Sequence, residues 1–543
     1  MPSPHAAALV AELHALIELQ GGDAHAPELA GAIAELEEHG ECTLLDRLRE
    51  STPEGLFEML RIPGLGPSRI RRIHDGLGVD SLQALEAAAR DGRLASLPRF
   101  GAATAEQVIR GIAALREAGR PWLLPHARAE GERLLAMVRA HPDVARAELA
   151  GSVRRCAEVV RDIDIVAACR GEPAAVAAHF SRAPGVRDAI GTGSRRVAIR
   201  YVDGTRLALQ CVPERDFVVA LWRATGTDTH VAEVTLRAAD RSLHLGDTLN
   251  DPMGIPLPVA DEPALYRAIG LEYVAPELRE GLGEVDAAAK RTLPRLVTTG
   301  DLRGVLHCHS QYSDGATTIA ELAVEARRRG WSYLGISDHS QSSFYTGGLT
   351  RESIEAQHDE IDEMNARLDG FRVLKGIEAD ILPCGRVDYP VEVLDRFDYV
   401  IASVHSRFGM NGAQMTERVL KALDDPHVTI LGHPTGRLLL TREAFAIDMD
   451  AVLEKAGADG VAVELNADPH RLDLDWRFGR EAKRHGAKIE IGPDAHSVDG
   501  LDNVGLGVDI ARKGWLTAGD VLNALDADGV LAFARARRVH AAR

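Results

Sequence analysis

Lysine is absent from the first half of the chain. The 543-residue sequence has no lysine before Lys290, so the positive charge of residues 1–289 comes from arginine. Codon usage explains such a bias without any functional cause. The bias still has one chemical consequence: because Schiff-base chemistry needs a lysine amine, residues 1–289 cannot supply it.

Cysteine is scarce, and long apolar runs are missing. The six cysteines are scattered and form no Cys-x-x-Cys pair, which argues against a disulfide framework and against a cysteine-rich zinc module. No apolar run approaches the roughly 20 residues that span a bilayer. The N-terminus also lacks the basic stretch and apolar core of a secretory signal. These absences predict a cytoplasmic protein.

Acidic residues outnumber basic ones, and this excess limits how the chain can bind nucleic acid. The formal net charge is −18, so bulk charge would repel phosphate groups. Any contact with nucleic acid must come from local motifs or from bound cations. The composition, 45% hydrophobic and 27% charged, is that of an ordinary globular protein, and the length predicts roughly two to four domains.

Two similar glycine-containing segments lie within residues 51–120. The first spans 60–73 and includes Pro-Gly-Leu-Gly, and the second spans 97–109 and includes Phe-Gly. Each predicts a helix, a tight hairpin and a second helix, in which the glycines let the turn approach a phosphate and the next N–H groups point at it. Helices that merely pack together are the alternative, and the repetition favours sequence-independent DNA binding. The candidate DNA-binding residues are Gly64, Gly66, Arg69 and Gly101, and Arg99 stands where the hairpin usually has a glycine.

A mixed α/β pattern follows from about residue 124 to residue 290. Strand-like runs lie at 146–149, 163–168, 196–202 and 206–212, and an acidic, alanine-rich segment then leads to a linker that ends near residue 300. Within this region, Gly-Ser-Val-Arg-Arg at 151–155 precedes Asp162 and Asp164. Side chains alternate along a strand, so both carboxylates lie on one face, as in metal-dependent nucleotidyltransferases.

Residues 301–543 alternate β-branched runs with helical stretches. Seven such runs lie at 304–306, 333–337, 372–377, 399–404, 428–432, 460–465 and 488–491. This alternation predicts parallel strands with helices outside, arranged as a barrel or a strongly curved sheet. In such folds the functional site lies at the carboxyl ends of the strands.

Potential metal ligands follow six of these seven runs. They are His307, His309, Asp314, His339, Glu378, His405, His433, Asp494 and His496. Nine candidates exceed what one ion can use, so we expect several ions. Imidazole and carboxylate without thiolate suit Mn²⁺, Zn²⁺ or Fe²⁺. Clustered metals produce hydroxide near neutral pH and hold the attacking and leaving oxygens of a phosphoryl displacement, so the pattern predicts phosphoester hydrolysis.

These motifs resemble two known families. His-Cys-His-Ser at 307–310, Ser-Asp-His-Ser at 337–340, Gly-Ile-Glu-Ala-Asp at 376–380, Gly-His-Pro-Thr-Gly-Arg at 432–437 and Asp-Ala-His at 494–496 resemble the PHP phosphoesterase domain. Gly-Ser-x-Arg-Arg with Asp-x-Asp resembles the family-X DNA polymerases. The whole chain is similar to the bacterial branch of that family with a C-terminal PHP domain.

The resemblance implies a multidomain fold and a division of the ligands among three metals. His307, His309, Glu378 and Asp494 would hold the first metal, the bridging Glu378 with His405 and His433 the second, and Asp314, His339 and His496 the third. The implied parts are a shortened N-terminal helical subdomain (1–50), a helix-hairpin-helix region (51–120), a nucleotidyltransferase palm (121–215), a thumb (216–290), a linker (291–300) and a PHP domain with a distorted (β/α)7 barrel (301–543). In the palm, Asp162 and Asp164 would be catalytic with Mg²⁺ or Mn²⁺, and Gly151, Ser152 and Arg155 would bind the nucleotide.

The palm departs from the family pattern at several positions. Ala208 stands where the family has a third aspartate, Arg161 replaces a glycine and Val159 replaces a threonine, and the segment 224–227 lacks its aromatic residue. The missing aspartate would help to hold the catalytic metal and take the proton from the primer 3′ hydroxyl. Its loss predicts a weak or inactive polymerase.

The leading hypothesis is a DNA repair protein whose PHP domain hydrolyses DNA phosphodiesters. It would act as a 3′→5′ exonuclease, and also at abasic sites, on gapped, nicked or 3′-ended duplex, as a monomer in the bacterial cytosol or nucleoid. Three alternatives stay open. The chain could be an active gap-filling polymerase that binds dNTPs, a phosphomonoesterase acting on a small phosphate ester, or a DNA-binding scaffold without catalysis.

Overall fold

The computed structural model describes residues 13–19, 29, 31–33, 44–45, 48, 52–60, 62, 64–117, 121–343 and 346–541. The chain divides into two compact units. The first comprises residues 1–120 with the short segments 200–205 and 406–410, and the second comprises the rest. The subdomain expected at 1–50 lies mostly outside the described residues. Among those that are described, no helix has both the length and the apolarity needed to cross a membrane.

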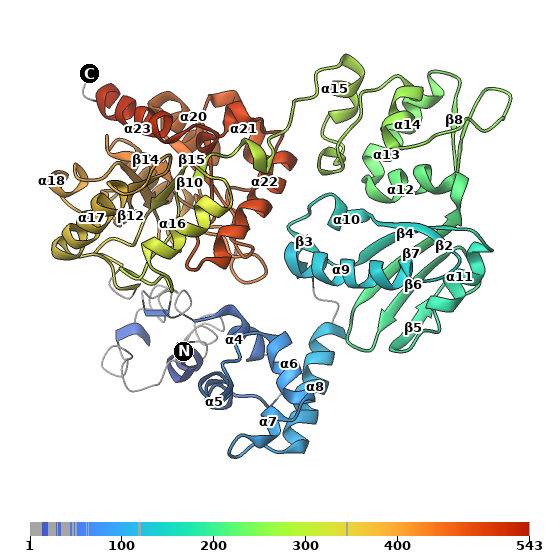
Figure 1. Cartoon of the computed structure of the whole chain (residues 1–543), viewed down its shortest axis with the longest axis horizontal. Coiled ribbons are helices and arrows are strands. Elements are labelled where there is room, and N and C mark those ends of the chain that lie inside the picture. Colours follow the sequence, from blue (N-terminus) through green and yellow to red (C-terminus); the bar gives the residue numbers. More distant parts are fainter. Residues whose placement is uncertain are drawn as a thin grey trace. The chain divides into compact units, whose positions relative to one another are not determined.

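Residues 52–117 form a small helical region (Figure 1). Its helices are α4 (Glu54–Met59), α5 (Pro67–Leu77), α6 (Leu82–Arg90), α7 (Arg93–Ser96) and α8 (Ala102–Glu117). The turn between α4 and α5 contains Gly64, and the turn between α7 and α8 contains Arg99, so both predicted hairpins are confirmed. Apolar side chains from these helices form a buried core that includes Ile70, Ile73, Leu85, Leu94 and Ile112.

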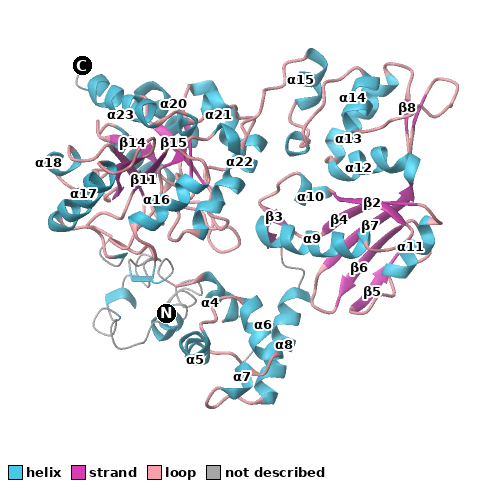
Figure 2. Cartoon of the chain, viewed as in Figure 1, coloured by secondary structure: helices cyan, strands magenta, loops and turns pink. Residues whose placement is uncertain are grey.

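The second unit begins with a five-stranded sheet in the order β2-β4-β7-β6-β5 (Figure 2). The strands are β2 (Val144–Leu149), β4 (Ile163–Cys169), β5 (Val186–Ile190), β6 (Arg196–Tyr201) and β7 (Arg206–Pro213). Strand β4 pairs antiparallel with β2 and parallel with β7. Helices α9 (Leu124–Arg139), α10 (Gly151–Arg154) and α11 (Pro173–Phe180) contact this sheet, and β1 (Trp122–Leu123) pairs with β3 (Val159–Val160) beside it. The four predicted strands are confirmed, and β5 is an additional one.

Residues 217–290 form a helical region with its own core. Its elements are α12 (Phe217–Thr225), α13 (Asp228–Ala239), the hairpin of β8 (His244–Leu245) and β9 (Leu249–Asn250), α14 (Glu262–Ile269) and α15 (Glu284–Lys290). Trp222, Val234, Leu265 and Tyr266 are buried together at its centre. The Trp222 indole N–H donates to the Tyr266 hydroxyl at 3.1 Å, so the polar atoms of these two large side chains satisfy each other.

Residues 304–492 form a seven-stranded parallel sheet whose strands follow one another in chain order, β10 to β16. The strands are β10 (Gly304–Val305), β11 (Tyr333–Ile336), β12 (Arg372–Asp380), β13 (Tyr399–Ser403), β14 (Val428–Leu431), β15 (Ala462–Asn466) and β16 (Ile489–Gly492). A parallel bridge joins Cys308 to Ala495, so the ends of the first and last strands lie together and the barrel is nearly closed. All seven predicted strands are confirmed.

Helices connect the barrel strands, as the alternating pattern predicts. They are α16 (Ile319–Arg328), α17 (Arg351–Asn365), α18 (Val391–Leu394), α19 (Gly412–Leu423), α20 (Met449–Asp459) and α21 (Gly479–His485). Helices α22 (Val504–Lys513) and α23 (Ala527–Ala541) follow the last strand. Capping boxes begin α16 at Thr318 and α19 at Asn411, which satisfies the free N–H groups of their first turns. Side chains of α23 share one buried cluster with Leu306, Tyr333, Leu374 and Tyr399 of the barrel.

Candidate functional site

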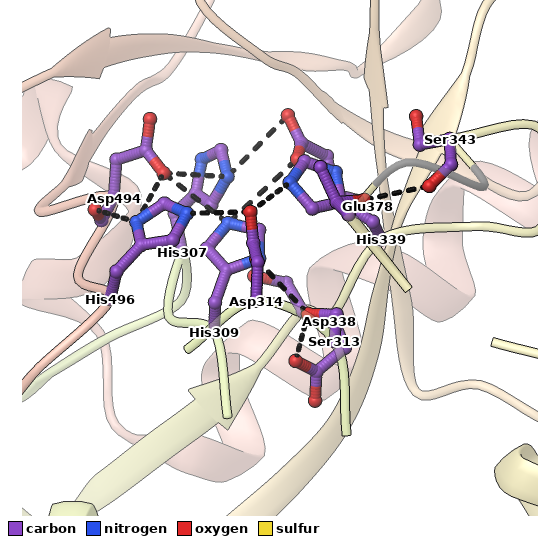
Figure 3. Close-up of polar contacts among 12 residues, drawn as sticks. His307, His309, Ser313, Asp314, Asp338, His339, Ser343, Glu378, Asp494 and His496 are labelled. Atoms are coloured by element: carbon purple, nitrogen blue, oxygen red, sulfur yellow. Dashed lines mark hydrogen bonds and ion pairs between the residues drawn. The ribbon is translucent and has the colours of Figure 1, made fainter. Parts of the chain in front are cut away.

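The carboxyl ends of the barrel strands bring the nine predicted metal ligands together. His307 and His309 follow β10, His339 follows β11, and Glu378 lies within β12. His405, His433 and the pair Asp494 and His496 follow β13, β14 and β16, and Asp314 lies in the loop after β10. Figure 3 shows imidazoles and carboxylates from several of these strand ends pointing toward one another.

Glu378 lies at the centre of this group and is 1% exposed. Its Oε1 is 2.9 Å from His433 Nε2, 3.2 Å from His405 Nε2 and 3.5 Å from His307 Nε2. Its Oε2 is 2.9 Å from His339 Nδ1. One carboxylate therefore faces imidazoles that follow four different strands.

Asp494 and Asp314 approach the remaining imidazoles. Asp494 Oδ1 is 3.2 Å from His309 Nε2 and 3.6 Å from His307 Nε2. Asp314 Oδ2 is 3.5 Å from His496 Nε2 and 3.6 Å from His339 Nε2. Two ligands that each lie about 2.1 Å from a shared ion are roughly 3.0–3.4 Å apart, so these separations are near those that a common metal requires.

Some ring nitrogens in this group are buried without a hydrogen-bond partner among the described residues. They include His307 Nε2, His309 Nδ1 and His433 Nδ1. Burial together with the neighbouring His496 and His339 lowers the pKa of His309 to about 4, so its imidazole is neutral at neutral pH. A neutral imidazole without a protein partner has a lone pair for a metal. The residues present therefore fit a metal centre.

Three combinations of ligand atoms within 4.8 Å of one another give this centre more than one place for an ion. The combinations are His309 with Asp314, His339 and His496; His307 with His309 and Glu378; and His339 with Glu378 and His405. Because Glu378 belongs to two of them, the sites are contiguous. Buried imidazole and carboxylate donors grouped in this way are consistent with metal binding.

Two carboxylates outside the nine predicted ligands contact those ligands or the loop that carries one of them. Asp380 Oδ1 is 2.7 Å from His405 Nδ1 and accepts the Ser343 hydroxyl at 2.8 Å. Asp338 accepts the backbone N–H of Ser310 at 2.7 Å and its hydroxyl at 2.6 Å. Asp338 thus fixes the loop that carries Asp314. The sequence signal that could have indicated them was their position, because Asp338 is next to His339 and Asp380 is two residues after Glu378.

The predicted polymerase residues lie at the amino-terminal end of β4, an inner strand of the five-stranded sheet. Asp162 precedes β4, and Asp164 lies on β4 beside Gly151. Gly151 has a φ of +58°, and a Cβ there would lie 1.9 Å from Asp164 Oδ2, so the carboxylate packs directly on this glycine. Burial and the nearby Asp162 raise the pKa of Asp164 to about 6, as expected for paired carboxylates. Ser152 follows Gly151 in the short helix α10.

The side chains of the two motif arginines are engaged with the helical region 217–290. Arg155 Nε donates to Glu280 Oε1 at 3.1 Å, and its Nη1 donates to the carbonyl of Thr225 at 2.7 Å. Arg154 pairs with Glu262 at 2.6 Å. Arg155, predicted to bind the nucleotide, is thus held by a carboxylate in this structure, whereas Arg161 is exposed.

The predicted DNA-binding residues lie at the two hairpins of the first unit. Gly64 has a φ of +81°, and Gly66 precedes the first turn of α5. The Arg69 guanidinium donates to the Gly64 carbonyl at 3.0 Å and so closes the first hairpin. At the second hairpin, Arg99 adopts a φ of +68°, which is the conformation that a glycine would take there, and Gly101 precedes α8. The turn geometry is therefore kept in spite of the substitution.

Comparisons with known proteins agree with this architecture. The SAM-like helix-hairpin-helix tandem matches residues 57–114, the DNA polymerase beta thumb matches 220–280 and the PHP domain matches 306–468. The chain is 34% identical over 512 residues to the DNA polymerase/3′-5′ exonuclease PolX of Bacillus subtilis (strain 168), which covers 92% of this chain and 88% of that protein. It is also 28% identical over 234 residues to a protein of Syntrophotalea carbinolica named "Probable phosphatase", which covers 40% of this chain and 90% of that protein.

The fold and the ligand cluster define the class of the protein: a PHP barrel with a metal-binding rim, joined to helix-hairpin-helix and polymerase-thumb regions. Within that class, the chain belongs to the family of PolX-type DNA polymerase/3′-5′ exonucleases. The family resemblance stated from the sequence is thereby confirmed.

Proposed function

We propose that this chain hydrolyses DNA phosphodiesters from the 3′ end, and at abasic sites, through the PHP metal centre. The observation that carries the proposal is the convergence on Glu378 of imidazoles from four strands. The PolX relative, whose name includes a 3′-5′ exonuclease, supports DNA as the substrate.

The residues that would hold the metals are the nine that the sequence predicts. We assign His307, His309, Glu378 and Asp494 to one ion, Glu378, His405 and His433 to a second, and Asp314, His339 and His496 to a third. When bound, Mn²⁺, Zn²⁺ or Fe²⁺ supplies hydroxide near neutral pH and positive charge for the attacking and leaving oxygens. The chain's own contribution is orientation: Asp380 holds His405, and Asp338 holds the loop of Asp314.

We also propose that the polymerase site no longer supports efficient synthesis. Ala208 pairs with Asp164 in the register of β4 and β7, so a methyl group stands where the third carboxylate would be. The guanidinium of Arg155, which would bind a triphosphate, is paired with the carboxylate of Glu280 instead. The alternative, a gap-filling polymerase that binds dNTPs at Gly151, Ser152 and Arg155, uses Asp162 and Asp164 alone.

The other regions would then hold DNA for the nuclease. We propose that residues 51–120 bind the backbone of gapped, nicked or 3′-ended duplex through Gly64, Gly66, Arg69 and Gly101. The palm (121–215) and thumb (216–290) would deliver the end, and the linker (291–300) would lead to the PHP domain (301–543). The chain would act as a monomer in the bacterial cytosol or nucleoid.

A second candidate is the hydrolysis of a small phosphate monoester. The phosphatase-named relatives favour it, because they match about the length of the barrel: that of Caldanaerobacter subterraneus is 30% identical over 210 residues, 35% of this chain and 74% of its own length. The two candidates are separated by incubating the full chain and Mn²⁺ with 3′-ended duplex and, separately, with p-nitrophenyl phosphate. A His309→Ala variant is the control. DNA shortening lost in the variant supports the nuclease; ester turnover without DNA cleavage supports the phosphatase.

A further inference from the structure

Strand β15 is the barrel strand from which none of the nine predicted ligands comes. Its sequence is Ala-Val-Glu-Leu-Asn, and Glu464 in its middle is fully buried. A buried carboxylate in an apolar strand is costly unless it has partners. The carboxylate of Glu464 accepts from Asn466 Nδ2 of the same strand at 3.3 Å, and its other partners are two predicted ligand residues that follow different strands.

Each carboxylate oxygen of Glu464 contacts a different ligand residue. Oε1 is 2.5 Å from His307 Nδ1, and Oε2 accepts the backbone N–H of His433 at 2.6 Å. An ionised Glu464 accepts the Nδ1–H of His307, and in the neutral imidazole the opposite nitrogen, Nε2, then keeps its lone pair. That nitrogen is the one that faces Glu378 and Asp494, and it has no hydrogen-bond partner among the described residues.

The contact with His433 fixes a backbone rather than a ring. His433 has a φ of +20°, outside the regions that most residues with a Cβ favour. Its N–H is held by Glu464 while its Nε2 lies 2.9 Å from Glu378 Oε1. Glu464 therefore holds this peptide in the orientation that turns the imidazole toward the centre.

The neighbouring residues are shaped around this carboxylate. A Cβ on Gly492 would lie 2.2 Å from Glu464 Oε1 and 3.0 Å from the Cβ of His307, so the glycine of β16 provides the space for their contact. Two residues further along β15, Asn466 Nδ2 donates to Asp494 Oδ2 at 2.9 Å. Strand β15, which supplies no predicted ligand, thus contacts the predicted ligand residues His307, His433 and Asp494.

We propose that Glu464 is a positioning residue of the metal centre, which holds His307 in the form that coordinates through Nε2 and ties it to His433. This inference rests on the metal centre proposed above. Mutation of a residue that hydrogen-bonds to a metal ligand typically lowers metal affinity by about 10- to 100-fold.

The test compares metal binding by the full-length protein and by Glu464→Gln. Glutamine keeps the volume but accepts hydrogen bonds on one oxygen only, so its NH₂ must face either the His307 Nδ1 proton or the His433 N–H. Both proteins are stripped with chelator and titrated with Mn²⁺ or Zn²⁺, the bound metal is counted by elemental analysis, and the melting temperature of each metal-free protein is recorded. We expect similar melting temperatures and a metal affinity about 10- to 100-fold lower in the variant.

Glu490→Gln is the matched control. Glu490 lies next to Glu464 in the register of β15 and β16 and is equally buried, but its carboxylate oxygens make no hydrogen bond to any of the nine ligands among the described residues. Its metal affinity should equal that of the parent protein. Should Glu464→Gln fail to fold, Glu464→Asp keeps the charge but is too short to reach both partners, and it should also bind metal more weakly.

Two results would overturn the inference. A folded Glu464→Gln with parental metal affinity, whether or not its metal-free form melts lower, would show that Glu464 serves the fold alone. A parent protein that takes up no metal would remove the metal centre together with the inference. The readout is metal binding and not hydrolysis. A parent protein that binds metal but does not hydrolyse DNA would therefore contradict the proposed substrate without contradicting the role of Glu464.

Discussion

Asp164 on β4 and Ala208 on β7 are direct partners in the register of two parallel strands. Both are half-buried, while Leu207 and Leu209, on either side of Ala208, point into the core. The side chain at position 208 therefore lies on the same face of the sheet as the Asp164 carboxylate. A third carboxylate placed there would complete the acidic group that a nucleotidyltransferase needs.

Ala208→Asp should therefore increase primer extension on a gapped template. A positioned proton acceptor contributes about 10²- to 10⁴-fold, so we expect a gain of at least about 100-fold with Mg²⁺ or Mn²⁺. Ala208→Asn, which has the same size without the charge, should gain little. Efficient extension by the unmodified chain, with no gain from Ala208→Asp, would show that the polymerase site is active as it stands.

Metal removal should abolish DNA hydrolysis by the parent protein. In the Glu378→Gln variant, added Mn²⁺ should not restore hydrolysis to the parental rate. The chelated parent protein should recover its activity with Mn²⁺. Because Glu378 faces imidazoles from four strands, the variant should bind less metal and hydrolyse DNA at least about 100-fold more slowly. Elemental analysis and a 5′-labelled primer measure the two effects. Parental hydrolysis by metal-depleted Glu378→Gln would place the reaction elsewhere in the chain.

Gly64→Ala should weaken binding to gapped duplex. Its φ of +81° strains any residue with a Cβ, and the added atom would lie 2.4 Å from Gln107 Nε2, so the hairpin must shift. Gly78→Ala is the control, because Gly78 has a φ of +63° at the end of α5 and its Cβ would meet nothing within 4 Å. Both variants should lose about 1 kcal/mol of stability, but only Gly64→Ala should bind a fluorescent gapped duplex several-fold more weakly. Equal DNA binding by the two would exclude the hairpin from the interface.

The buried ion pairs of Glu262 should make the helical region 217–290 sensitive to acid. Burial alone would raise the pKa of Glu262, but Arg154 and Arg279 lower it to about 2. A depressed carboxyl pKa contributes stability that is present above the unfolded value near 4.5 and is lost as the pH falls toward 2. This contribution is about 3 kcal/mol at pH 7.

Glu262→Gln should remove that contribution. Urea unfolding followed by tryptophan fluorescence should show the variant less stable than the parent at pH 7, and the difference should shrink steadily below about pH 4.5. Trp222, in the same core as Tyr266 and Leu265, reports on this region. A difference that stays constant down to pH 3 would mean that the charge of Glu262 contributes nothing to stability.

Most of the barrel, and the convergence of the nine candidate ligands, could be predicted because the signal is local. The strands are short β-branched runs, and a predicted ligand lies within or just after six of the seven, so strand and ligand are recognised together. Glu464 could not be found this way. It lies inside an apolar run rather than after it, and its partners, His307 and His433, are 157 and 31 residues away. An acidic residue within a buried strand was the signal available.

The palm shows the same limit. Strand alternation predicts Asp162 and Asp164 as a pair, although Asp162 precedes β4 in the structure. The contact of Arg155 with Glu280 could not be predicted, because it joins residues 125 apart and depends on the packing of another region. Strand β5 was missed because its residues are half-buried or exposed and carry no apolar alternation. Arg99 stands where the second hairpin usually has a glycine, yet its φ of +68° keeps the turn. Backbone conformation of this kind is not visible in residue type.

The most direct measurement of the central claim uses a 5′-labelled gapped primer-template with Mn²⁺, with and without nucleotides. The parent protein, His307→Ala and the control Glu490→Gln are compared. We predict that the parent and the control shorten the primer without extending it, and that His307→Ala leaves the primer intact. Primer extension by the parent that survives in His307→Ala would contradict the account, because it would show an active polymerase in spite of Ala208.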